Sequence, residues 1–155
     1  MVELAELLSP RRIALDLRPG SRRQLFREIA ALVAPDIGVD VERIVDALLE
    51  REKLGTTAIG GGIAIPHAKL PELDRMVGAF ARLAEPVDFE ALDGKPVDLV
   101  FVLLAPENAS AEHLKALARL ARLLRDPALC ERLRREQDIK RLHAALTGRA
   151  KSQAA

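Results

Sequence analysis

The chain has little of what many functional sites are built from. It holds one cysteine, Cys130, and neither tryptophan nor tyrosine among its 155 residues. A single cysteine excludes an internal disulfide and a cysteine-based metal cage. Because free cysteines usually pack as small apolar residues, we expect Cys130 to be buried on a helix near Leu129 and Leu133.

Excess charge and long apolar runs are absent as well. The 24 Lys and Arg residues nearly cancel the 23 Asp and Glu residues, which argues against nucleic-acid binding by net charge. The longest apolar run, residues 99–105, has seven residues, whereas a membrane-spanning helix needs roughly 20. Residues 1–12 carry no apolar stretch of the secretory type. We therefore expect a cytoplasmic protein with no membrane insertion and no nucleic-acid partner.

Motifs for nucleotides and catalytic metals are also missing. No GxxxxGK[ST] segment occurs, so a nucleotide cradle of that type is excluded. The three histidines are not accompanied by paired carboxylates at ligand spacing, so a zinc hydrolase does not fit. We expect no cofactor and no metal site.

The length and the 49% share of hydrophobic residues predict one folded domain over residues 1–150, with a loose tail at 151–155. Caps and apolar residues at three-and-four spacing predict its helices. They lie at residues 21–35, capped by Ser21 and stopped by Pro35; at 40–55, capped by Asp40 and closed by Gly55; at 111–125; from 127 onward; and from Asp138 to just before Gly148. The helix at 111–125 should bury Leu114, Leu117, Leu120, Ala121 and Leu124.

Strands are predicted at residues 13–17, at 76–83 and at 97–104, the last nearly all apolar and therefore buried on both faces of a sheet. Between residues 56 and 70 glycines replace the helical period, which indicates two short extended pieces around a bend. Residues 85–96 are expected to form a surface loop. The fold class that follows is α/β: a small mixed sheet of four or five strands covered by helices.

The most unusual segment leads to a histidine. Three consecutive glycines, 60–62, and then Pro66 precede His67. Such a glycine run marks a sharp bend or a close approach of another group, and Pro66 holds the backbone before His67 in an extended shape. A histidine at a strand end is more often structural than catalytic, and from these residues alone both interpretations stay open.

The order of three motifs resembles a known family. The strings ERE-LG-T, GIAIPH and HLKALARL follow one another between residues 7 and 146. This order is similar to the fructose/mannitol-type IIA domains of the bacterial phosphoenolpyruvate-dependent phosphotransferase system, above all to their stand-alone nitrogen-regulatory branch. The resemblance implies the IIA fold, phosphorylation of His67 on Nε2, and support of the phosphoryl group by His113 and Arg51. Ala58 and Ala68 replace glycines that are common in the family.

The residues themselves fit this chemistry. A histidine with a pKa near 6.5 has a neutral fraction whose free nitrogen can act as a nucleophile. The other ring nitrogen must be held by a hydrogen bond, to a backbone carbonyl or to a hydroxyl such as that of Thr57. His113 lies in the first turn of a helix that begins near Ser110, where amide groups and the helix dipole favour an anion.

Simpler structural roles stay open for these residues. His113 fits a boundary position on its helix, and Arg51 fits a solvated charge or a partner of Glu50 or Glu52. We assign His143 a structural role near the end of the last helix, where a cation favours the dipole.

The resulting hypothesis is a phosphoryl-accepting regulatory component, a relay rather than a free-standing enzyme for small molecules. It would take the group from a histidine phosphocarrier protein onto His67 and act on a target such as a sensor kinase or a potassium transporter. One alternative is a sugar-transport IIA component that passes the group to a IIB domain. Another is a binding module that no longer uses His67. The chain carries no permease segment, which favours regulation.

Phosphorylation is expected to act by local charge. A phosphoryl group adds about −1.5 to −2 charges at one place on a nearly neutral protein. Around it we expect an apolar rim that includes Ile63, Ile65 and Leu70 and that stays nearly fixed.

Overall fold

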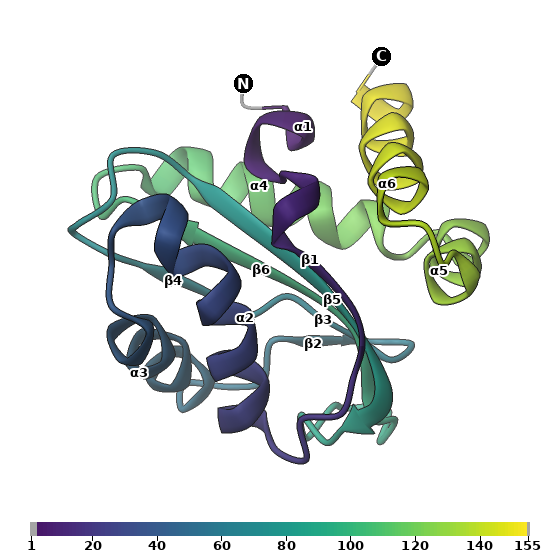
Figure 1. Cartoon of the computed structure of the whole chain (residues 1–155), viewed down its shortest axis with the longest axis horizontal. Helices are drawn as coiled ribbons and strands as arrows, with labels where there is room; N and C mark the ends of the chain where they lie inside the picture. The colour runs from purple at the N-terminus through teal and green to yellow at the C-terminus, as the bar shows by residue number, and fades with distance from the viewer. Residues whose placement is uncertain (1–2, 155) are drawn as a thin grey trace.

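Figure 1 shows the computed structural model of the chain, which describes residues 3–154, with side chains described through residue 148. The helices are α1 (Leu4–Leu7), the 3-10 helix η1 (Pro10–Arg12), α2 (Arg22–Ile37), α3 (Val41–Glu52), α4 (Ser110–Leu123), α5 (Pro127–Arg135) and α6 (Ile139–Ala154). The strands are β1 (Ile13–Leu17), β2 (Ala58–Gly60), β3 (Ile63–Ala64), β4 (His67–Lys69), β5 (Val77–Val87) and β6 (Val97–Ala105).

Within the described residues the strands form one mixed sheet of six, in the order β1-β5-β6-β3-β2, with β4 also paired to β6. β5 runs antiparallel to β6, whereas β3 and β4 run parallel to it. This confirms the predicted α/β class with a mixed sheet. The sheet exceeds the predicted four or five strands because Pro66, which has no N–H to donate, separates β3 from β4.

Strand β6 is the centre of the fold, and its alternate side chains reach two different cores. Val100, Val102 and Leu104 belong to the core that α2 and α3 cover. Leu99, Phe101 and Leu103 belong to the core that α4, α5 and α6 cover. Figure 1 shows these two groups of helices on either side of the sheet. The prediction that this strand is buried on both faces is confirmed, and each such side chain contributes roughly 1.5–3 kcal/mol through burial.

Caps start the helices where the sequence predicts them. Ser21 Oγ accepts from Gln24 N at 3.1 Å, Asp40 Oδ2 from Glu42 N at 3.1 Å, and Asp138 Oδ1 from Arg141 N at 3.0 Å. Asp126 caps α5 in the same way, just before Pro127. Each cap satisfies an amide that the helix itself leaves without a partner.

The predicted ends of α2 and α6 are wrong. α2 continues through Pro35 to Ile37, because a proline in the last turn removes only one hydrogen bond, and Gly38 ends the helix in the left-handed conformation at φ +67°. α6 continues through Gly148 to Ala154, so residues 151–154 are helical rather than a loose tail. A glycine costs a helix only about 1 kcal/mol relative to alanine. Residue 155 lies outside the described residues.

The predicted start of the loop at residues 85–96 is wrong, because the strand before it is longer than predicted. β5 runs on to Val87 and pairs it with Val97 across an irregularity in register that follows Arg82. Pro86 is accommodated in this irregular part, where regular pairing is already interrupted.

Two further sequence predictions concern single side chains of the α5–α6 region. Cys130 is buried, and its thiol donates to Leu124 O at 3.0 Å, which confirms a structural position on a helix. His143 lies in the second turn of α6 rather than near its end, because the helix extends further than predicted. Its Nε2 contacts Leu8 O at 2.7 Å and so links α6 to the N-terminal segment.

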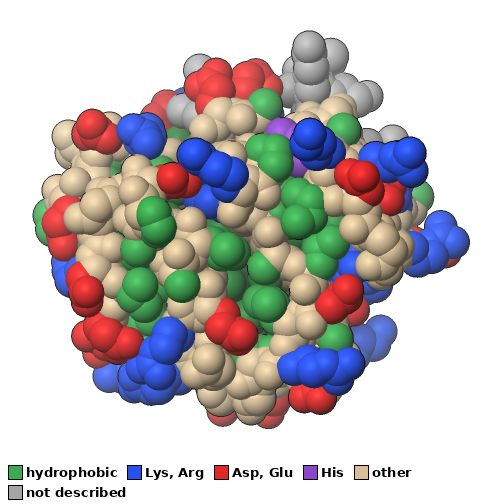
Figure 2. Space-filling model, viewed as in Figure 1, with side chains coloured by type: hydrophobic (Ala, Val, Ile, Leu, Met, Phe, Trp, Pro, Cys, Tyr) green, Lys and Arg blue, Asp and Glu red, His purple; other side chains and the backbone are tan. Residues whose placement is uncertain are grey.

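The surface carries both signs of charge. Acidic and basic side chains are interspersed over the face in Figure 2, in keeping with a formal charge of +1. Over the part of the chain that the structure describes, no helix is both long and apolar enough to cross a membrane.

Candidate active site

His67 is the first residue of β4, and both of its ring nitrogens have partners. Nδ1 lies 2.8 Å from the carbonyl oxygen of Ile65, two residues earlier. Arg51 Nε donates to His67 Nε2 at 3.2 Å. A carbonyl oxygen can only accept, so Nδ1 carries the proton and Nε2 presents its lone pair toward Arg51. The backbone carbonyl that the sequence predicts as one possible partner is therefore found at Ile65.

His113 lies in the first turn of α4 and faces His67. The two rings meet edge to face with centroids 5.4 Å apart. The His113 side chain is buried, with the residue 4% exposed, and its Nε2 has no hydrogen-bond partner. The residue before the helix, Ala109, has no polar side-chain atom with which to cap the first amides. A buried nitrogen and uncapped amides therefore lie together beside His67.

Both histidines are held in the neutral form. Burial lowers the pKa of His113 to about 4, with smaller contributions from the charges of His67 and Lys69. Burial is also the main cause that lowers the pKa of His67 below its usual value, while its bond to the Ile65 carbonyl acts in the opposite direction. A lowered histidine pKa enlarges the neutral fraction near pH 7, which is the nucleophilic form.

Arg51 reaches the site from the last turn of α3. Besides His67, its guanidinium donates to Gly55 O at 3.0 Å. Glu50 pairs with Lys53 at 2.7 Å and Glu52 with Arg22 at 3.5 Å, so these two acids have other cations as partners. The structure thus brings Arg51, His67 and His113 together from α3, β4 and α4.

Thr57 does not touch His67. Its side chain is buried, and its hydroxyl donates to a carboxylate oxygen of Glu52. The prediction that the Thr57 hydroxyl could hold a His67 nitrogen is wrong, because that hydroxyl already has a partner and the Ile65 carbonyl takes this place.

The glycine run lies away from His67. Ile63 pairs with Leu99 of β6 and His67 with Leu103, a separation of four residues or roughly 13 Å along the strand. Gly61 N donates to Asp93 Oδ2 at 2.9 Å, and Gly61 O accepts from Arg134 at 2.8 Å. The run makes the turn between β2 and β3, where all three glycines have positive φ, and does not line the histidine site.

The three residues predicted to form an apolar rim around His67 do not form one. Ile63, Ile65 and Leu70 are buried in the two cores. Two exposed leucines lie near site residues along the chain: Leu54, 83% exposed, is three residues after Arg51, and Leu114, 68% exposed, directly follows His113. Leu114 was expected in the buried stripe of α4, but in this first turn His113 takes the inward position.

Sequence reasoning missed Lys69. It follows His67 by two residues on β4, and its exposed Nζ donates to Ser110 Oγ at 2.6 Å at the start of α4. Side chains two apart on a strand share a face, so the period of the strand was the signal that could have identified Lys69. The pair connects the His67 strand to the His113 helix.

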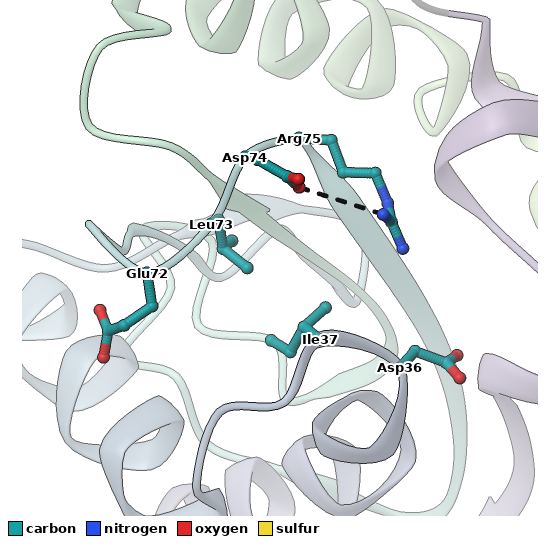
Figure 3. Close-up of a pocket in the computed structure, with 6 residues that line it drawn as sticks. All are labelled: Asp36, Ile37, Glu72, Leu73, Asp74 and Arg75. Atoms are coloured by element: carbon teal, nitrogen blue, oxygen red, sulfur yellow. Dashed lines mark ion pairs between the residues drawn. The ribbon is translucent and has the colours of Figure 1, made fainter.

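One hollow of about 370 Å³ lies at the start of α4, where Ala109 and Glu112 are among the residues that line it. Another hollow, of about 240 Å³, is lined by Asp36, Ile37, Glu72, Leu73, Asp74 and Arg75, none of which is a site residue described above. Figure 3 shows these six residues. Among them, Asp74 and Arg75 form an ion pair of 4.0 Å. Among residues whose side chains are described, no group of three or more His, Cys, Asp or Glu is placed to hold a metal ion.

Known proteins share the sequence and the fold. Residues 6–148 match the family described as "Phosphoenolpyruvate-dependent sugar phosphotransferase system, EIIA 2". A nitrogen regulatory protein of Bradyrhizobium diazoefficiens is 50% identical over 143 residues, covering 92% of this chain and 94% of that protein. The crystal structure of nitrogen regulatory protein IIA-Ntr from Neisseria meningitidis superimposes with a TM-score of 0.88 at 39% identity, covering 92% and 98% of the two chains.

A more distant solved structure has the same fold in a complex. It is the complex of enzyme IIAMTL and phosphorylated enzyme IIBMTL from Escherichia coli, with a TM-score of 0.76 at 26% identity, covering 91% and 97% of the two chains. The resemblance drawn from the three sequence motifs is confirmed: the chain belongs to the type 2 EIIA family of the phosphoenolpyruvate-dependent sugar phosphotransferase system.

Proposed function

We propose that this chain accepts a phosphoryl group on His67 Nε2 from a histidine phosphocarrier protein and regulates a target protein according to its phosphorylation state. The observation that carries the proposal is the bond from His67 Nδ1–H to the Ile65 carbonyl at 2.8 Å. It leaves Nε2 as the basic nitrogen, which is the nucleophilic one in a neutral imidazole.

The transfer step follows from this geometry. The Nε2 lone pair attacks the phosphorus of the carrier's phosphohistidine, and the P–N bond to the carrier breaks with its electron pair returning to that histidine. Arg51 occupies the Nε2 lone pair at rest, so its guanidinium must shift to the phosphoryl oxygens as the donor arrives. This exchange replaces a hydrogen bond to a neutral ring by a charge-assisted one.

His113 is suited to support the phosphoryl group. With a pKa of about 4 it stays neutral at pH 7, and its buried Nε2 has no other partner. As an N–H donor it would gain a hydrogen bond when an anion is placed beside it, and the N-terminus of α4 favours the same charge.

Regulation follows from the surroundings of His67. A target that packs over His67 would cover the half-buried histidine and exclude water from it. A phosphoryl dianion buried there without a partner would be very costly, so such a target would bind the unphosphorylated form. The relatives named nitrogen regulatory protein support a regulatory role. The target class that we propose is a sensor kinase or a potassium transporter. A chain that takes its phosphoryl group from the carrier must share a compartment with it, and the compartment we propose is the cytoplasm.

Transport of a sugar is the second candidate. The mannitol-type structure solved with phosphorylated IIB supports it, because that protein has the same fold. Regulation is favoured because the nitrogen regulatory protein of Bradyrhizobium diazoefficiens is 50% identical over 92% of this chain, whereas a fructose-specific EIIA component of Haloferax volcanii is 43% identical over 63% of it. A binding module that no longer uses His67 would not need the fixed tautomer or the unpartnered nitrogen of His113.

His67→Ala should abolish phosphorylation. Incubation with phosphoenolpyruvate, the first enzyme of the system and the phosphocarrier should label the wild-type chain with an acid-labile, base-stable phosphate. His143→Ala is the matched control and should be labelled like the wild type, because the His143 side chain bonds to Leu8 O in the N-terminal segment and not to a site residue. Labelling that persists without His67 would contradict the assignment.

Arg51→Ala and His113→Ala should each slow transfer without abolishing it. Losing one charge-assisted hydrogen bond costs about 1.5–3 kcal/mol, or roughly ten- to a hundredfold in rate if the bond acts in the transition state. Single-turnover transfer from the phosphorylated carrier measures this rate. Arg43→Ala, which removes an exposed pair with Glu72 from the same helix, should leave it unchanged. Wild-type rates in both site variants would show that neither residue assists.

Stability should fall in mild acid because of His113. The unfolded chain binds a proton at His113 near pH 6.5, whereas the folded chain binds it only near pH 4, so acid favours unfolding between these values. The loss attributable to His113 reaches about 3 kcal/mol at the lower end of this window. Urea unfolding at several pH values should show it, and His113→Gln should remove most of it. An unchanged pH dependence in that variant would place the cause elsewhere.

A further inference from the structure

The loop between α3 and β2 holds both partners of His67. Gly55 O accepts from Arg51 Nη1 at 3.0 Å and so fixes the guanidinium that meets His67 Nε2. Two residues later, Thr57 O accepts from Ile65 N at 3.0 Å. Ile65 is the residue whose own carbonyl holds His67 Nδ1. A shift of this loop would therefore disturb the two sides of the ring together.

Glu52 anchors that loop. Its side chain is 5% exposed, and its two carboxylate oxygens accept from Thr57 twice: from the hydroxyl and, at 3.4 Å, from the backbone N–H. The carboxylate lies at the end of α3, one residue after Arg51. The end of α3 thus supplies both Arg51, which contacts His67, and Glu52, which anchors the loop that holds Arg51.

The charge of Glu52 is compensated from α2. Arg22 Nη1 lies 3.5 Å from its Oε2, and the other end of that guanidinium lies 3.8 Å from Glu90. The Arg22 guanidinium also stacks over the Phe89 ring at 5.8 Å. With Thr57 and Arg22 as partners, Glu52 has its hydrogen-bonding capacity directed to the loop and not to His67, which excludes it as the base that would accept a proton from that ring.

We infer that Glu52 is a positioning residue for phosphoryl transfer: through Thr57 it fixes the loop that sets both the tautomer of His67 and the place of Arg51. The inference rests on the proposed function of His67 and adds to it a residue that acts only through others. Catalytic groups displaced by even 1 Å can lose roughly a hundredfold in rate, so a buried anchor behind the site has a measurable effect.

Three variants test this role in the full chain: Thr57→Val, Glu52→Ala and their combination. Transfer from the phosphorylated carrier should show kcat lowered by about tenfold or more with KM for the carrier changed less than about twofold, because Thr57 and the Glu52 side chain are buried and do not themselves contact the carrier. If Glu52 acts through Thr57, the double variant should be no slower than the slower single variant. Thr57→Ser, which restores the hydroxyl, should return kcat to near the wild-type value.

The tautomer of His67 gives a second readout that needs no phosphoryl donor. Nitrogen-15 shifts of the ring should report Nδ1–H in the wild type and a mixture with Nε2–H in Thr57→Val. Thr147→Val is the matched control, because it removes a threonine hydroxyl bond to His143 O at 2.8 Å in α6. At an equal loss of unfolding free energy it should change neither kcat nor the ring shifts.

Opposite results would overturn the inference. One is a wild-type tautomer and a wild-type kcat in Thr57→Val. Another is a loss of kcat that Thr147→Val reproduces at equal stability. The third is a double variant whose kcat falls by the product of the two single effects. If Glu52→Ala does not fold, the Val and Ser variants of Thr57 decide alone. If the wild type takes no phosphate on His67, the proposed function fails, while the ring shifts still decide whether the anchor sets the tautomer.

Discussion

The hydrogen bond from His67 Nδ1–H to the Ile65 carbonyl is the constraint on which the site depends. It joins residues on either side of Pro66, whose fixed φ turns the chain so that a carbonyl and a ring two residues apart can meet. Once Nδ1 holds the proton, Nε2 must present a lone pair. The roles of the neighbouring groups depend on this arrangement. Arg51 meets the lone pair, His113 lies edge-on to the ring, and burial keeps both histidines neutral.

Strand β6 is the part of the fold that brings His67 and His113 close together. β4 pairs with the last residues of β6, so His67 lies opposite Leu103 near its carboxyl end. The chain then leaves β6 and enters α4, which brings His113 to the same edge. Sites of open α/β sheets commonly lie at the carboxyl ends of strands, where helix N-termini also point. The two cores on the faces of β6 keep this edge rigid, so the chemistry rests on the most buried strand of the molecule.

The sequence supports the main features of fold and site because these depend on local pattern. The apolar run of β6, the caps Ser21 and Asp138, and the motif around His67 are all readable along the chain. Long-range packing decides what the sequence misplaces. Leu114 is exposed and His113 buried because the first turn of α4 faces β4. The Thr57 hydroxyl bonds to Glu52, five residues earlier, because the chain turns back at the end of α3, which the sequence pattern did not show. The glycines serve a turn whose partners, Asp93 and Arg134, are far away in sequence.

The most direct measurement of the central claim is the position of the P–N bond. The chain, labelled with nitrogen-15 in its histidine rings, is phosphorylated by the carrier and followed by nitrogen and phosphorus NMR. The account predicts that phosphorus couples to His67 Nε2 and that Nδ1 keeps its proton, because the Ile65 carbonyl continues to hold it. Phosphorus bound to Nδ1, or to any residue other than His67, would contradict the account.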